Sequence, residues 1–224
     1  MHGDGKPART LRRARRETNM GSPLQLRTPE EALALLSEGN NRFVERRSLH
    51  GKISEELLDN LRESQRPFAV ILGCSDSRVP PELVFDQSFG DLFVIRLAGN
   101  LIAPGVAGSI QYAYEHLGTS LLVVLGHQGC GAVKAALDAR FHRAKHPERI
   151  QQLVGLIEPG LEQIDPELSA AEQLDSAVEA NVRWSMHQVI RAPEARQAFQ
   201  RNGNVLIVGA VYELSTGKVR WLDR

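Results

Sequence analysis

Four short, uninterrupted apolar runs constrain the fold of this chain more than any other sequence feature. They lie at 68–74, 92–97, 121–126 and 204–209. Runs of this length are typical of strands that are buried on both faces of a parallel sheet. Helical patterns separate several of the runs, at 105–117, 130–141 and 169–191. Strands that alternate with helices predict an α/β fold, with a mostly parallel central β-sheet flanked by helices.

Helical signals also precede the first apolar run. Thr28 and Glu31 form a capping-box pattern around a proline, which predicts a helix that begins at this point and ends near Arg47. A second, shorter helix is expected at about 55–64. The sequence therefore predicts two helices before the first strand of the sheet.

The second half of the chain holds the end of the sheet and one segment without a clear pattern. Two short runs, 211–214 and 218–222, flank a Ser-Thr-Gly turn and predict a terminal hairpin. The segment 142–168 contains several prolines, and its pattern predicts neither a helix nor a strand.

The charges of the chain balance overall but are unevenly distributed. Lys and Arg total 27, as do Asp and Glu, which argues against nucleic acid or an anionic membrane as the main partner. Six basic and only two acidic residues fall within 1–20. We therefore expect a basic, disordered tail at 1–23 and a single α/β domain at 24–224. No apolar run reaches the roughly 18–20 residues of a membrane helix, and the basic segment lacks the apolar stretch of a secretory signal, so a cytoplasmic location is expected.

Polar clusters follow two of the apolar runs, at the points where the predicted strands end. Cys74 ends the first run, and His127 and Cys130 follow the third; the chain has no other cysteine. Ligand sites of open parallel sheets lie at the carboxyl ends of the strands, so we expect these three side chains to meet. Thiolates and imidazoles are the usual ligands of zinc, and a Cys₂His set leaves one position open, as a catalytic zinc requires.

Asp76 and Arg78 follow Cys74 closely and could serve such a site in two ways. Asp76 could be a fourth ligand of the metal in a closed state. Alternatively, Arg78 could hold the carboxylate by a bidentate ion pair, which would leave Asp76 to accept a hydrogen bond from a zinc-bound water. Two other interpretations of the cysteines stay open at this point: inert buried thiols, or a disulfide, which a reducing compartment disfavours.

In this order, the motifs resemble those of the β-class carbonic anhydrases. The matching segments are Cys-Ser-Asp-Ser-Arg-Val-Pro at 74–80, Arg-x-Ala-Gly-Asn at 96–100 and Gly-His-x-x-Cys-Gly at 126–131. The resemblance runs from about residue 28 to residue 222, so it covers nearly all of the chain outside the basic tail.

The resemblance implies one Zn²⁺ per subunit, held by Cys74, His127 and Cys130, with Asp76 and Arg78 as a catalytic dyad. The implied reaction is the reversible hydration of carbon dioxide to bicarbonate and a proton, by attack of zinc-bound hydroxide oriented by the dyad. Two alternatives stay open. One is hydrolysis of a CO₂ isostere such as CS₂ or COS on the same scaffold, and the other is a non-catalytic protein in which zinc serves assembly.

The resemblance also implies a substrate pocket and a subclass. Gln65 matches a residue that lines the pocket in the subclass with a permanently open zinc site. Phe93 and Tyr112 match an apolar and a phenolic position around the same pocket. The backbone N–H near Gly131, at a predicted helix start, is expected to donate to a developing oxyanion. Ile71 stands where the other subclass, which closes its site, carries a tryptophan.

The family is built from dimers whose N-terminal helices wrap the partner, and the dimers often pair into tetramers. The resemblance therefore implies a homo-oligomer, in which the helix predicted from residue 28 to about 47 packs on a partner subunit.

Overall fold

A central sheet organises the structure, a computed structural model that describes residues 27–49, 54–193 and 205–223. Its strands are β1 (Ala69–Gly73), β2 (Leu92–Arg96), β3 (Leu121–His127), β4 (Leu206–Tyr212) and β5 (Val219–Trp221). The order in space is β2-β1-β3-β4-β5, with every pair parallel except β4 and β5. All residues of β1 and β3 are buried, as their unbroken apolar sequences predict for central strands. The mostly parallel sheet is confirmed.

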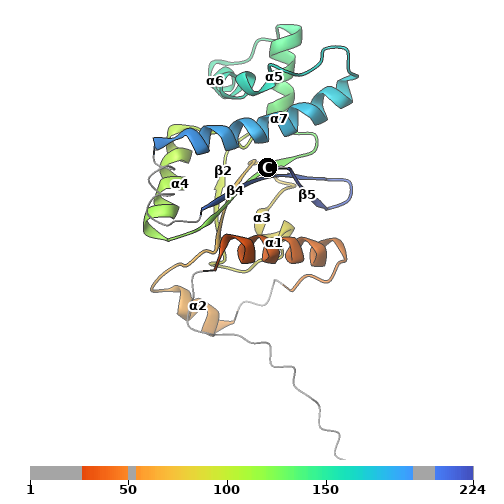
Figure 1. Cartoon of the computed structure of the whole chain (residues 1–224). Helices are drawn as coiled ribbons and strands as arrows, with labels where there is room; N and C mark the ends of the chain where they lie inside the picture. Colours follow the sequence, from red (N-terminus) through yellow and green to blue (C-terminus); the bar gives the residue numbers. More distant parts are fainter. Residues whose placement is uncertain (1–26, 50–53, 194–204, 224) are drawn as a thin grey trace, which may run out of the picture.

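Helices cover both faces of this sheet, as Figure 1 shows. The helices are α1 (Pro29–Val44), α2 (Glu55–Leu61), α3 (Pro81–Val84), α4 (Pro104–His116), α5 (Gly131–His142), α6 (Glu148–Ile157) and α7 (Ala170–Arg191), with a 3₁₀ turn η1 (Glu158–Leu161). Successive residues of a strand point to opposite faces. Accordingly, Val70 and Leu72 pack in one apolar cluster with Val182 of α7, whereas Ile71 packs with Leu36 of α1 in another.

Helix α1 is tied to the sheet of its own chain. Thr28 and Glu31 form the predicted capping box. The buried Asn40 side chain donates to the carbonyl oxygens of Val84 (3.0 Å) and Gly217 (2.9 Å), and its own carbonyl oxygen accepts from the N–H of Val219 at 2.8 Å. Packing of this helix on a partner subunit stays a prediction, and so does the disordered tail, because 1–23 lies outside the described residues.

The structure adds detail where the sequence patterns were weak. The segment 142–168 contains α6 and η1, although no side chain caps the start of α6. The first half of the predicted strand 211–214 is the end of β4, because pairing with β3 continues without a break to Tyr212 opposite His127. The predicted terminal hairpin is therefore formed by β4 and β5. Among the described residues, no helix is both long and apolar enough to cross a membrane.

Candidate metal centre

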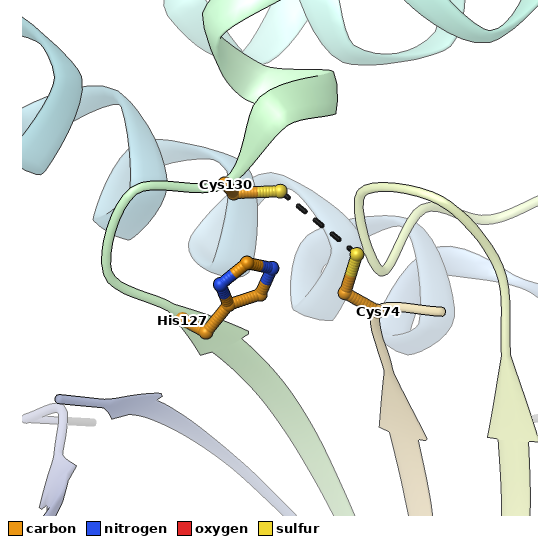
Figure 2. Close-up of side chains that lie close together, drawn as sticks. All are labelled: Cys74, His127 and Cys130. Atoms are coloured by element: carbon orange, nitrogen blue, oxygen red, sulfur yellow. Dashed lines mark hydrogen bonds between the residues drawn. The ribbon is translucent and has the colours of Figure 1, made fainter. Parts of the chain in front are cut away.

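Three potential metal ligands meet at the carboxyl edge of the sheet. Cys74 directly follows β1, His127 is the last residue of β3, and Cys130 is the N-cap of α5. Because β1 and β3 are parallel neighbours in register, their ends bring the three side chains together. The ligand atoms all lie within 4.8 Å of one another, and the two sulfur atoms are 4.0 Å apart (Figure 2). These distances confirm the predicted convergence. The cysteines are free, so no disulfide joins them.

The imidazole of His127 is oriented for metal binding. Its Nδ1 lies 3.0 Å from the carbonyl oxygen of Gln128, and a proton on Nδ1 donated to that oxygen leaves the lone pair of Nε2 free. Nε2 is buried and has no hydrogen-bond partner. Figure 2 shows the ring beneath the two sulfurs, with one nitrogen toward them. A buried nitrogen acceptor beside two sulfurs fits a zinc ion.

The contact between the two cysteine side chains shifts their pKa values in opposite directions. The hydrogen bond between the two sulfurs lowers the pKa of Cys74, and the N–H of Gly99 lowers it further. The same bond raises the pKa of Cys130, which is also buried. A divalent cation that binds both sulfurs would displace the protons of the thiols.

Asp76 lies beside this cluster and forms an ion pair with Arg78. The guanidinium donates from Nε to Oδ1 at 2.8 Å and from Nη2 to Oδ2 at 2.7 Å, and the backbone N–H of Arg78 donates to Oδ1 at 3.0 Å. These bonds hold the pKa of Asp76 well below its usual range. Its Oδ2 is 3.9 Å from Nε2 of His127. The carboxylate is thus ionised and faces the metal ligands without lying among them.

The residues predicted to line the substrate pocket divide between the two edges of the sheet. Gly131 begins α5 next to Cys130, at the cluster. Gln65 and Tyr112 instead line a groove of about 810 Å³ at the amino edge, and Phe93 stacks on Tyr112 with ring centres 6.2 Å apart. The five residues of β1 separate the two edges by roughly 16 Å at about 3.3 Å per residue.

The contacts that two residues, Gly99 and Arg96, make at the site were not predicted. The N–H of Gly99 donates to the sulfur of Cys74 at 3.3 Å. Arg96 braces the same loop by donating to the carbonyl oxygens of Cys74 (2.9 Å) and Asp76 (2.6 Å). The signal for both is their position: they lie at and just after the end of β2, whose carboxyl end adjoins that of β1.

Comparisons with known proteins identify the family. A sequence model described as carbonic anhydrase matches residues 69–219. The fold superposes on that of a Coccomyxa β-carbonic anhydrase in complex with acetazolamide, with a TM-score of 0.70, 27% identity and coverage of 86% of each chain. The chain belongs to the β-class carbonic anhydrases. It is therefore an enzyme, and the resemblance noted in its sequence is confirmed.

Mycobacterial carbonic anhydrases are among the similar relatives. The carbonic anhydrase of Mycolicibacterium smegmatis is 37% identical over 191 residues, which covers 85% of this chain and 92% of that one. Carbonic anhydrase 2 of Mycobacterium tuberculosis is 36% identical over 190 residues, with 85% and 91% covered. The similarity to these relatives thus extends well beyond the metal-ligand motifs.

Proposed function

We propose that this carbonic anhydrase hydrates CO₂ at a zinc ion held by Cys74, His127 and Cys130, with Asp76 and Arg78 as its catalytic dyad. The observation that carries the proposal is the unpartnered Nε2 of His127, buried beside two sulfurs and 3.9 Å from a carboxylate that is already ion-paired. This donor set satisfies three positions of a tetrahedral zinc and leaves the fourth for chemistry. When bound, the zinc would supply Lewis acidity, which makes a water in the site nucleophilic near neutral pH.

Asp76 is proposed to orient the attacking water. As an ionised carboxylate it can only accept hydrogen bonds, so it fixes one proton of the water and leaves an oxygen lone pair directed at CO₂. Arg78 occupies both oxygens of the carboxylate, which favours this role over direct binding of the metal and supports the open subclass. Gly131 contributes its backbone N–H, at the start of α5, to the oxygen of CO₂ that becomes negative.

We further propose that Gln65, Phe93 and Tyr112 line the substrate pocket of a second copy of the chain. Within one chain they lie at the edge of the sheet opposite the metal ligands, so they can serve only a site that another subunit presents. Tyr112 is 47% exposed and borders the groove that contains Gln65, as expected of an aromatic residue that a partner covers. The proposal therefore includes a homo-oligomer in which each site is completed by two subunits.

Mixed oligomers test this arrangement. We expect Gln65→Ala to lower kcat/KM by up to about tenfold through loss of one hydrogen bond to substrate, with no change in zinc content. Co-assembly with Cys74→Ser chains, which lack an intact metal site but retain Gln65, should restore activity per zinc. If the mixed oligomer is no more active per zinc than Gln65→Ala alone, Gln65 does not act across subunits.

The function itself is tested by metal analysis coupled to stopped-flow CO₂ hydration of the purified chain. We expect one zinc per subunit and a rate that rises between about pH 7 and 9, because two thiolates add negative charge and so keep the pKa of the nucleophilic water above the value of about 7 seen with neutral ligands. Asp76 cannot cause this rise: its lowered pKa leaves it ionised throughout that range. A flat profile would refute the proposed nucleophile. Zinc-loaded protein that acts on COS or CS₂ instead, or on none of the three substrates, would support the alternative functions.

A further inference from the structure

Helix α7 reaches the metal site through two buried polar side chains. Asn181 and Ser185 lie one turn apart and are fully buried. The side-chain amide of Asn181 donates to the carbonyl oxygen of Gly99 at 2.7 Å, and the hydroxyl of Ser185 donates to the carbonyl oxygen of Asn100 at 3.0 Å. Both acceptors belong to the loop after β2 whose Gly99 N–H contacts Cys74. Polar groups are rarely buried this deeply in a helix unless they have such partners.

The backbone at Gly99 is held in one conformation from several sides. Its φ of +84° favours glycine, and a Cβ there would come within 2.8 Å of Cδ1 of Ile157 and 3.1 Å of Cβ of Ala132. The residue thus accepts a hydrogen bond from Asn181 on its carbonyl while its N–H donates to the sulfur of Cys74. A shift of this residue moves both contacts together.

We propose that Asn181 is a positioning residue for the metal ligand Cys74, acting through Gly99. By anchoring the Gly99 carbonyl, it keeps the Gly99 N–H on the sulfur, where the hydrogen bond orients the ligand and withdraws part of its negative charge. Hydrogen bonds from outside the ligand set commonly control both the affinity of a site for its metal and the pKa of a water bound to that metal. Asn181 itself touches neither substrate nor metal in this role.

Loss of the Asn181 amide should change the hydrogen bonding of the Cys74 sulfur. Without its donor the buried Gly99 carbonyl has no partner, and the loop gains by moving toward any other donor. The N–H of Gly99 then leaves the sulfur of Cys74, which becomes more electron-rich and less well oriented. The consequence is weaker metal binding together with an altered metal–sulfur bond, which simple destabilisation of the helix would not produce.

The test is Asn181→Leu, which keeps the branched outline of the side chain and removes its donor. We expect zinc affinity, measured by competition with a chelator, to fall about 10- to 100-fold. With Co²⁺ in place of zinc, the sulfur-to-cobalt charge-transfer band should move to longer wavelength, because a more electron-rich sulfur gives up its electron more easily. Val189→Ala is the matched control: Val189 is 4% exposed on the same helix, so this variant should lower thermal stability without either change at the metal.

Asn181→Ser provides a second variant in case leucine disturbs the packing of α7. The serine side chain is small, polar and too short to reach the Gly99 carbonyl. The same loss of affinity and the same band shift are expected. Folded protein of either variant with zinc affinity within about twofold of the wild type and an unmoved cobalt band would overturn the proposal, as would an equal loss of affinity in Val189→Ala.

Discussion

Replacing Cys130 with serine is expected to remove bound zinc and to lower CO₂ hydration on the order of 10³-fold or more, because the water in the site loses the ion that makes it nucleophilic. Serine is a weak zinc ligand but a strong N-cap, and Cys130 is the N-cap of α5 with extended backbone angles. The substitution therefore removes the thiolate while it favours the helix. Zinc content by elemental analysis and stopped-flow hydration are the measurements.

Circular dichroism controls for folding in this experiment, since α5 should be retained. Cys74→Ser, which lies outside any helix, should show the same loss of metal and activity. A Cys130→Ser protein with one zinc per subunit and near-normal turnover would show that the metal, if it is needed, is bound elsewhere.

Arg78→Ala is expected to lower CO₂ hydration about 100-fold with zinc content unchanged, because misplacement of an orienting group by about 1 Å can cost that much. Arg78 makes three hydrogen bonds to Asp76. The alanine variant keeps only the one from the backbone, so the carboxylate is free to turn toward the metal. Since the Arg78 side chain is 55% exposed, the fold should tolerate the change.

Two further variants sharpen this prediction. Arg78→Lys keeps the positive charge but not the two parallel hydrogen bonds, so it should recover only part of the activity. Arg149→Ala removes an exposed hydrogen bond to Gln152 within α6, outside the metal centre and the groove that contains Gln65, and should leave the rate unchanged. Normal turnover of Arg78→Ala would contradict the role given to the dyad.

The metal site could be predicted from sequence because it depends on local patterns. Cys74 and His127 each terminate an unbroken apolar run, and parallel strands bring such ends to one edge of the sheet whatever the remainder of the chain does. The bidentate pair of Asp76 and Arg78 is equally local, since the residues are two apart. The positions of β1, β2 and β3 were predicted to within one residue at each end for the same reason, whereas β4 was divided between two predicted strands.

Features that depend on long-range packing were not accessible in this way. The hydrogen bond from Asn181 to Gly99 joins residues 82 positions apart, and no spacing rule connects them. Helix α6 was missed because the prolines of its segment, Pro147, Pro159 and Pro166, obscured a helical pattern. Gln65 and Tyr112 could be matched to a pocket, but their position at the opposite edge from Cys74 becomes visible only when the strand directions are known.

The place of β4 in the sheet bears on how the protein is made on the ribosome. All three candidate metal ligands have been synthesised by residue 130, yet β3, which carries His127, gains its second neighbour only when 206–212 emerge. Until then the edge of β3 has unpaired backbone groups, which are open to contact with other nascent chains. The nascent chain thus carries all of its proposed zinc ligands some 80 residues before β3 can pair on both sides.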